Sequence, residues 1–260
     1  MNLSNNTILI TGGGSGIGLA LAKQFLRLNN KVIICGRNAD KLQAAKQKYT
    51  SLEVVQCDVA NEESVLALLE ELQQRYPDLN FLVNNAGIMR LWNIQRETTN
   101  TIEQKAEILI NLFGTIQLTQ LLIPKLLRQK KATILNVSSA LAEVPMPAAP
   151  IYSATKAAIH SYSIAIRQQL QNTNISVFEL LPAAIATDMA NEIEKSIGIS
   201  DNNPKMTPEK LAILTIKGLK NDMLVIRPGM ANTLHVIHRF FPSVAQKMIS
   251  SQSKKMLQKL

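Results

Sequence analysis

The chain has 260 residues, of which 46% are hydrophobic and 18% charged, and its formal net charge at pH 7 is +9. This composition supplies a large hydrophobic core and excludes a disordered chain, while the length favours one large domain. The positive charge would suit an anionic ligand, an acidic membrane surface or nucleic acid, but aromatic residues make up only 4% and nowhere interleave with basic ones, so no nucleic-acid partner is expected.

Short β-branched runs alternate with segments of helical length along the chain. The expected strands are residues 7–11, 31–35, 53–57, 79–83, 132–137, 175–181 and 223–227. Helical segments such as 17–28 and 61–76 lie between them, and several strands are apolar at consecutive positions, as in a parallel sheet covered on both faces. The pattern predicts an α/β fold, a doubly wound parallel sheet of about seven strands in a single domain over residues 1–260, with ligands at the carboxyl ends of the strands.

Two segments are assigned other roles. Residues 188–207 have no place in the alternation and are predicted to form a mobile flap over the site, and residues 230–260 a C-terminal helical tail. The tail has an apolar stripe formed by Val244, Met248, Met256 and Leu260. We expect this stripe to dock on the protein's own core or on a second subunit, and contact with an acidic membrane surface is the alternative.

The N-terminus and the metal-binding residue types exclude other classes. No basic n-region or cleavage site precedes the first strand, and no apolar run approaches the roughly 18 residues that cross a bilayer, so a cytoplasmic protein is expected. Cys35 and Cys57 end two predicted strands and read as buried thiols. His160, His235 and His238 form no recognisable ligand motif, so no metal centre is expected.

The first strand runs into the glycine-rich loop TGGGSGIG at residues 11–18, and a helical run follows. Glycines allow the backbone to approach a pyrophosphate closely, and the amides and dipole of the next helix favour its charge. A dinucleotide is the expected ligand, and a purely structural loop is the alternative. The residues expected to contact it are Gly12, Gly14, Ser15, Gly16, Ile17 and Gly18.

The end of the second strand bears on the choice between NADP(H) and NAD(H). NAD sites usually place an acidic residue there to bind the ribose 2′-hydroxyl, whereas this chain has Gly36 and Arg37. A guanidinium suits a 2′-phosphate, and Ser15, Asn38 and Lys41 could assist it. We therefore expect NADP(H) over NAD(H); the alternative is that Arg37 is only a solvated surface cation.

The spacing TGxxxGxG, carried by Gly12, Gly16 and Gly18, resembles the short-chain dehydrogenase/reductase family, which has a Rossmann fold. The similarity extends over nearly the whole chain up to the sixth strand. It implies further cofactor contacts at Asp58, Val59, Asn85, Ala86, Gly87, Pro182 and Thr187. Turn chemistry is the alternative for Asn84 and Asn85. Residues 139–170 are most similar to a subgroup associated with D-alanylation operons in Gram-positive bacteria.

The resemblance also implies four residues that act together, namely Asn111, Ser139, Tyr152 and Lys156. Carbonyl reduction needs a proton donor at the oxygen, and a phenol, with a pKa near about 10, needs a cation beside it to act in the reverse direction. A spacing of four places Tyr152 and Lys156 on one helix face, where Lys156 would lower the phenol's pKa and also hold the nicotinamide ribose. Both are therefore expected cofactor contacts as well.

The other two residues have supporting roles in this scheme. Ser139 would bind the substrate oxygen, and Asn111 would bind a water that resupplies protons. A capping or loop role for Ser138 and Ser139, and a buried polar role for Asn111, are the structural alternatives. Taken jointly, the four residues favour catalysis.

The predicted function is that of an NADP(H)-dependent oxidoreductase that transfers a hydride between the nicotinamide and a carbonyl or secondary alcohol, as a homodimer or homotetramer. A non-catalytic redox sensor of the same fold is the alternative, and a membrane-surface scaffold a third possibility. Ala142 and Ala183 replace glycines frequent in the family, which affects the shape of the pocket. Walls at 88–92, 141–146 and near Met189, with Arg90 and Glu143 for a polar group, suit a medium-sized, partly hydrophobic carbonyl compound.

Overall fold

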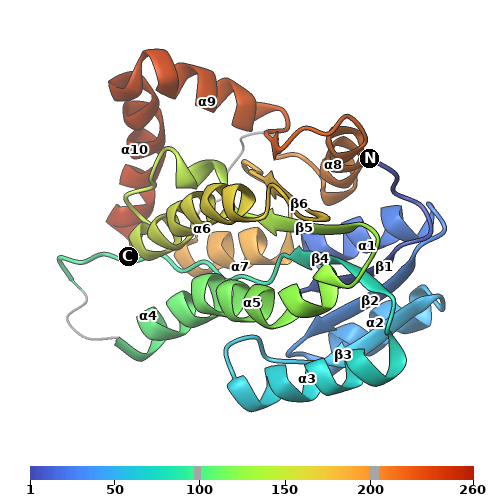
Figure 1. Cartoon of the computed structure of the whole chain (residues 1–260). Helices are drawn as coiled ribbons and strands as arrows, with labels where there is room; N and C mark the ends of the chain where they lie inside the picture. Colours follow the sequence, from blue (N-terminus) through green and yellow to red (C-terminus); the bar gives the residue numbers. More distant parts are fainter. Residues whose placement is uncertain (97–100, 199–204) are drawn as a thin grey trace.

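Within residues 1–96, 101–198 and 205–260, which the computed structural model describes, seven strands form one parallel sheet in the order β3-β2-β1-β4-β5-β6-β7 (Figure 1). The strands are β1 (Thr7–Thr11), β2 (Lys31–Gly36), β3 (Leu52–Gln56), β4 (Leu79–Asn84), β5 (Ala132–Val137), β6 (Ile175–Leu180) and β7 (Val225–Ile226). The strand order reverses between β1 and β4, which opens a crevice at their carboxyl ends. The predicted doubly wound α/β fold is confirmed.

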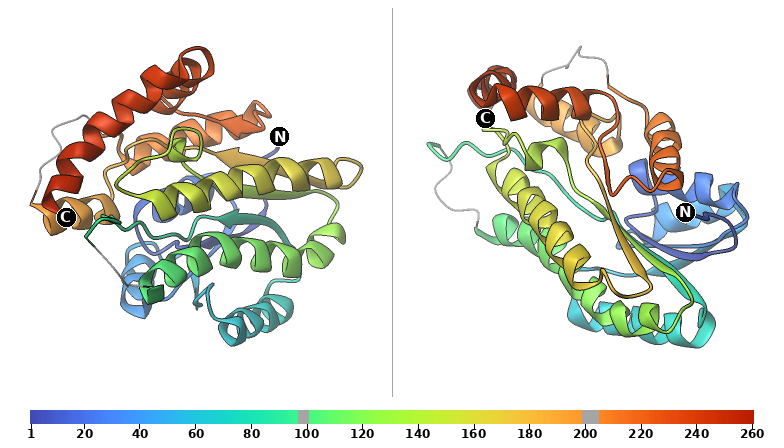
Figure 2. Two further views of the ribbon diagram at one scale, coloured as in Figure 1. Left: turned by 90° about the vertical axis from the view of Figure 1, so that its left-hand side faces the viewer. Right: turned by 45° about the horizontal axis from the view of Figure 1, so that its top comes forward.

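Helices cover both faces of the sheet (Figure 2). Alternate residues of the central strands pack against α1 (Gly16–Leu26), α2 (Ala39–Lys48) and α8 (Pro208–Lys220) on one face. The residues between them pack against α3 (Glu62–Arg75), α5 (Gly114–Leu127) and α6 (Pro150–Gln169) on the other. Strand residues such as Leu9 and Ile10 are therefore both fully buried, which explains why these strands are apolar at consecutive positions.

A continuous helical run joins α4 (Thr101–Ile108), the π-helical turn η1 (Leu109–Phe113) and α5. Among the described residues, this run is the one helical stretch as long and apolar as a membrane-spanning helix, with a mean hydropathy of 1.4. This stretch differs from the expectation that no apolar run approaches the length needed to cross a bilayer. One side of it packs against β4, β5 and α6, but only 39% of its apolar window is buried, and Phe113 and Leu121 are 48% and 40% exposed.

Two predicted segments differ from expectation. The strand predicted at 223–227 is only two residues long, because Leu224 and Met223 are about half exposed at the edge of the sheet and Arg227 turns away to pair with Glu143. The flap predicted at 188–207 begins as a regular helix, α7 (Asp188–Ile197). Its residues 199–204 lie outside the described residues, and Met206 then pairs with Ile185.

The C-terminal tail forms two helices, α9 (Met230–Phe240) and α10 (Pro242–Lys259), which pack on each other and over the 3₁₀ turn η2 (Ala140–Ala142) (Figure 2). The predicted apolar stripe is partly wrong, because Val244 and Met248 are 49% and 46% exposed. The buried line of α10 runs instead through Ala245, Ser253 and Met256. The tail is therefore part of the protein's own core, and it covers the carboxyl end of the sheet.

Candidate active site

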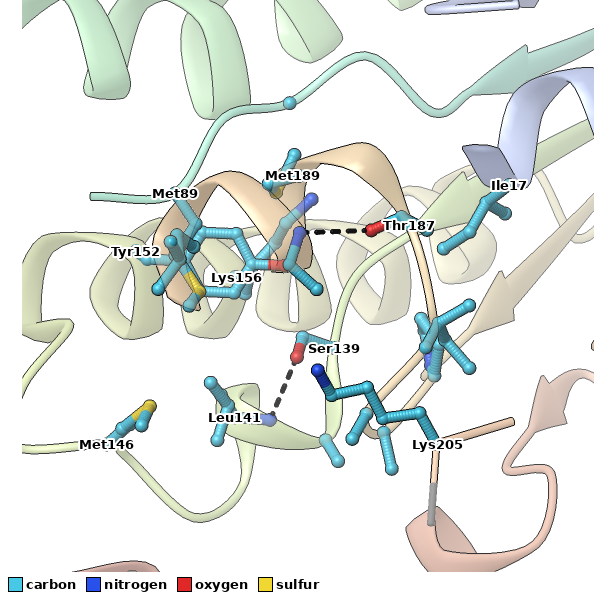
Figure 3. A pocket seen from close by; sticks show the side chains of 18 of the residues that line it. Ile17, Met89, Ser139, Leu141, Met146, Tyr152, Lys156, Thr187, Met189 and Lys205 are labelled. Carbon is cyan, nitrogen blue, oxygen red and sulfur yellow. Dashed lines mark hydrogen bonds between the residues drawn. The ribbon is translucent and has the colours of Figure 1, made fainter. Parts of the chain in front are cut away.

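A cavity of about 690 Å³ lies at the carboxyl ends of β1, β4, β5 and β6. The glycine-rich loop, the NNAG segment after β4 and the two serines after β5 form its inner wall, together with Tyr152 and Lys156 of α6. Side chains of α7, α9 and α10 form the outer wall, and Figure 3 shows Met189 of α7 beside the inner wall. The topology thus brings together segments that are far apart along the chain.

The glycine-rich loop is fastened to the end of β4. The side-chain amide of Asn85 donates hydrogen bonds to the carbonyl oxygens of Thr11 (2.9 Å) and Gly12 (3.2 Å). A Cβ on Gly18 would lie 2.4 Å from the Gly12 oxygen and 2.6 Å from this amide, so only glycine fits there. Gly12 also has a φ of +63°, which favours glycine. Asn85 therefore acts on the loop as well as on the cavity wall.

The same loop leaves backbone donors at the start of α1. Ser15 is the N-cap residue, but its side chain makes no capping hydrogen bond to the described residues, so the first amides of the helix keep their donors. Gly12, Ser15, Gly16 and Ile17 all line the cavity. Donors at a helix N-terminus beside a close-packed glycine loop fit the pyrophosphate of a dinucleotide.

The remaining predicted cofactor contacts divide into two groups. The residues that line the cavity are Asn85, Ala86, Gly87, Tyr152, Lys156, Pro182 and Thr187. The residues that lie outside its wall are Gly14, Gly18, Arg37, Asn38, Lys41, Asp58 and Val59. Among the latter, Asp58 accepts a hydrogen bond from the amide of Ala60 (3.0 Å) just before α3. A structural role is thus visible for it in this structure.

Of the four residues expected at a 2′-phosphate, Ser15 lines the cavity, and the other three have different environments. Arg37 is exposed directly after β2, and its guanidinium has no hydrogen bond or ion pair with the described part of the chain. The side chain of Asn38 caps α2 by accepting from the Lys41 amide (2.8 Å), which sequence analysis did not foresee. The ammonium of Lys41 lies 3.6 Å from the carboxylate of Asp188, at the start of α7. Of these three residues, Arg37 is therefore the one whose charged side chain has no partner in the described part of the chain.

The inner wall of the cavity contains the side chains of Ser139, Tyr152 and Lys156 (Figure 3). Ser139 is the N-cap of η2, and its Oγ accepts a hydrogen bond from the Leu141 amide (3.1 Å). The Nζ atom of Lys156 lies 5.6 Å from the centre of the Tyr152 ring and donates to the carbonyl oxygen of Val137 (2.9 Å). The capping role considered for Ser139 is therefore present, and its hydroxyl also interacts with the phenol of Tyr152.

Asn111 lies behind this group, in the π-helical turn, and is 1% exposed. Its side chain accepts from the amide of Ile88 (2.8 Å) and donates to the carbonyl oxygen of the same residue (2.8 Å). It also donates to Thr155 (3.2 Å), next to Lys156. The buried structural role considered for Asn111 is thus present, since it clamps the chain after NNAG against α6.

Burial dominates the protonation of the tyrosine and the lysine. It raises the pKa of Tyr152 to about 12, although the hydroxyl of Ser139 acts in the opposite direction. Burial also lowers the pKa of Lys156 to about 8, opposed by the charge of Glu179. In the protein alone, the phenol therefore stays protonated at neutral pH, and the expected lowering of its pKa by Lys156 is not seen.

Sequence analysis missed a buried carboxylate behind these residues. Glu179 of β6 is fully buried, and it accepts hydrogen bonds from the Ser138 hydroxyl (2.5 Å) and from Nδ1 of His160 (2.8 Å). The bond to Glu179 raises the pKa of His160. The one available signal was an acidic residue inside the otherwise apolar run ISVFELL. Glu179 thus braces the strand end that carries Ser139 and places a negative charge near Lys156.

A reaction in this cavity that uses the charged form of Lys156 is expected to slow as the pH rises through about 8, because burial lowers the pKa of this ammonium to about 8. Its rate should be retained below this pH and lost above it. Glu179→Gln should move the loss to lower pH, since it removes the negative charge that holds the lysine's pKa up. The measurement is kcat/KM from roughly pH 6 to pH 10; a profile unchanged by Glu179→Gln would contradict the assignment.

The predicted polar groups of the pocket are wrong. Arg90 donates to the carbonyl oxygen of Glu103 (3.1 Å), and Glu143 pairs with Arg227 (2.6 Å) and His235 (3.0 Å). Neither lines the cavity, because each is turned toward partners outside it. Of residues 88–92 only Met89 lines the cavity, and of 141–146 only Leu141 and Met146 do.

The helical tail supplies walls that sequence analysis did not expect. Met230, Thr233, Leu234 and Ile237 come from α9, and Met248, Ile249, Gln252 and Met256 come from α10. The charged side chains of Glu194 and Lys205 also line the cavity, and they pair with each other. The tail therefore contributes directly to the pocket.

The described residues include no cluster of three or more His, Cys, Asp and Glu side chains that could hold a metal ion. Cys35 and Cys57 are buried free thiols, as predicted.

Known proteins resemble this chain over most of its length. A family model for short chain dehydrogenases matches residues 6–198. An uncharacterised oxidoreductase, DltE, of Bacillus subtilis is 42% identical over 200 residues, 77% of this chain and 79% of the relative. A short chain dehydrogenase of Burkholderia cenocepacia in complex with NADP has the same fold (TM-score 0.82, 23% identity, 96% and 99% of the two chains). So does a Burkholderia phymatum protein in complex with NAD (TM-score 0.79, 20% identity, 94% and 96%).

Proposed function

The chain belongs to the short-chain dehydrogenase family, and on this basis we propose that it is an NADP(H)-dependent carbonyl reductase with Tyr152 as the proton donor. The observation that carries the proposal is the shared cavity. Ser139, Tyr152 and Lys156 line it together with the glycine loop whose amides suit a dinucleotide. Function is argued from this site, because the fold alone supports many activities.

The binding steps follow from the cavity wall. The amides at the start of α1 would hold the pyrophosphate, and Thr187 and Lys156 lie where the nicotinamide end would be bound. The nicotinamide dinucleotide, when bound, supplies the hydride to the carbonyl carbon. The hydroxyl of Ser139 accepts a bond from the Leu141 amide, and it would donate its proton to the carbonyl oxygen of a bound substrate.

The proton for the same oxygen comes from Tyr152. Its phenol gives up the proton as the oxygen gains charge, which yields the alcohol and leaves a phenolate. The ammonium of Lys156, fixed by the Val137 carbonyl oxygen, then stabilises this phenolate across the 5.6 Å that separate it from the ring. A phenol with a pKa of about 12 is protonated at neutral pH and can therefore act as the acid in the reduction.

The preference for NADP(H) rests on Arg37. Its exposed guanidinium stands directly after β2 without a partner among the described residues, and no acidic side chain occupies the position that would bind a ribose 2′-hydroxyl. A fixed, bidentate cation there favours a 2′-phosphate. Both NADP and NAD occur in proteins of this fold, so the residue at this position has to discriminate between them.

We also propose that the protein is a cytoplasmic homo-oligomer. Phe113, Leu121 and Ile164 are between 40% and 48% exposed on η1, α5 and α6. Large apolar side chains on the outer surface of the molecule favour a contact with a second copy.

The proposal is tested by mixing the protein with NADPH or NADH and a panel of aldehydes and ketones. We expect NADPH to be consumed with at least one carbonyl compound, and faster than NADH. Saturable binding of the dinucleotide without turnover of any compound would support the redox sensor instead. Fluorescence titration of the reduced cofactor measures binding independently of turnover.

A further inference from the structure

Methionines gather around the cavity. Six of the nine methionines of the chain line it, namely Met89, Met146, Met189, Met230, Met248 and Met256. They come from the segment after β4, the loop after η2, and helices α7, α9 and α10. Unbranched thioether side chains adapt to irregular apolar ligands, and proteins that bind varied apolar partners use them for this purpose. We call these six residues the methionine wall.

The methionine wall begins at the reacting group. Tyr152 packs in one apolar cluster with Met89, Met146 and Met256, and Figure 3 shows Met89 beside the tyrosine. Met146 and Met256 are 6% and 8% exposed, so this end is deep inside the protein. A carbonyl compound that reaches Tyr152 must therefore place its substituents against apolar side chains.

The other end of the wall reaches solvent. Met230 is 61% exposed and Met248 is 46% exposed, although both line the cavity. Leu234 and Ile249, on the same two helices, continue the apolar lining inward. The wall thus forms an apolar path from the surface, along α9 and α10, to Tyr152.

The charged side chains of the cavity do not offer a site for an ionic substituent. Lys205 is paired with Glu194, and the ammonium of Lys156 is held by the Val137 carbonyl oxygen next to Tyr152. Asp188, which also lines the cavity, pairs with Lys41. A carboxylate or phosphate on the substrate would have to displace one of these partners, whereas a neutral chain would not.

We propose that the substrates are carbonyl compounds with a flexible, uncharged hydrocarbon chain, which lies along the methionine wall while the carbonyl oxygen meets Ser139 and Tyr152. This inference rests on the proposed function. In this step the carbonyl carbon takes the hydride of the reduced nicotinamide, and the carbonyl oxygen takes the proton of Tyr152. The products are the alcohol and the oxidised cofactor. Each methylene that leaves water should strengthen binding about fourfold.

The test uses a homologous series of linear methyl ketones with the full-length protein. KM for NADPH-dependent reduction should fall about fourfold per added methylene until the wall is covered, with kcat changing little. Calorimetry of the same ketones with the NADP⁺ complex gives the affinity without turnover. A KM and an affinity that do not improve with chain length would overturn the inference, and reduction of short ketones would then leave the proposed function standing.

Two variants test where the hydrocarbon chain of the ketone lies in the cavity. Met248→Gln should weaken binding of the longest ketone about tenfold and leave the shortest unchanged, because the substitution puts an amide on the apolar path. Met223→Gln is the matched control, since Met223 is 49% exposed and lies outside the cavity. Equal effects of the two substitutions would contradict the proposed position of the chain. Chain-length-dependent affinity without reduction of any ketone would support the apolar site and count against the reductase.

Discussion

Tyr152→Phe is expected to lower kcat for carbonyl reduction by about 10²–10⁴-fold. The substitution removes only the phenolic hydroxyl, which is the proton donor, and keeps the ring that packs against Met89, Met146 and Met256. The glycine loop and Arg37 are unchanged, so the affinity for NADPH should stay within about twofold. Steady-state kinetics and cofactor fluorescence titration on the same preparation measure the two quantities.

Tyr162→Phe is the matched control. Tyr162 lies on the same helix, α6, but does not line the cavity. Its substitution should leave kcat nearly unchanged. Undiminished turnover in Tyr152→Phe, or an equal loss in both variants, would mean that the phenol of Tyr152 is not the proton donor.

Arg37→Asp is expected to reverse the choice of cofactor. The ratio of kcat/KM for NADPH to that for NADH should fall by about 100-fold, since a hydrogen bond to a charged group contributes about 1.5–3 kcal/mol and the new carboxylate repels a 2′-phosphate. Aspartate at this strand end also offers an acceptor for a ribose 2′-hydroxyl. Arg37 is exposed and has no side-chain partner in the described structure, so folding should not suffer.

Arg27→Asp controls for the change in overall charge. Arg27 is also exposed, but it lies at the C-terminal end of α1, away from the cavity. The charge change is the same, so a general electrostatic effect would appear in both variants. An NADPH-to-NADH ratio that is unchanged in Arg37→Asp would show that the 2′-phosphate is not bound at the end of β2.

The sheet was predictable because its central strands are buried on both faces, which makes each of them a short apolar run. The edge strand β7 was the exception. Only Val225 and Ile226 pair with β6, and the flanking residues Met223 and Leu224 are apolar but exposed. Apolar composition alone does not show where pairing stops at a sheet edge, since it reports burial and not hydrogen bonding.

The inner wall of the cavity and the contribution of the segment around Met189 were predictable from local patterns, whereas the lining from α9 and α10 and the partners of the buried carboxylates were not. Tyr152 and Lys156 are four apart on one helix, and Ser139 follows a strand directly. The partners of Glu143 are 84 and 92 residues further along the chain, so nothing near Glu143 indicates that Arg227 and His235 neutralise it. The same holds for Glu179, whose partners come from the end of β5 and from α6.

Helix α10 shows a second reason why a sequence pattern can mislead, since the pattern did not indicate which face of the helix is buried. The predicted stripe ran through Val244 and Met248, while the buried line runs through Ala245 and Ser253, and the two lines share Met256. The sequence allows either line to be the buried one. Ala245 on one face packs against η2, and Met248 and Met256 on another face line the cavity. A periodic pattern shows that a helix is amphipathic, but the choice between two apolar faces depends on what lies beneath each.

Transfer of deuterium tests the central claim, that this cavity catalyses hydride transfer, most directly. The protein is incubated with NADPH deuterated at C4 of the nicotinamide, on the transferring face, and with the ketone series, and the products are examined by mass spectrometry. We predict one deuterium on the carbinol carbon of the product alcohol with the native protein, and none within the same time with Tyr152→Phe. Tight binding of NADPH with no deuterated alcohol from any compound would contradict the account and identify a dinucleotide sensor instead.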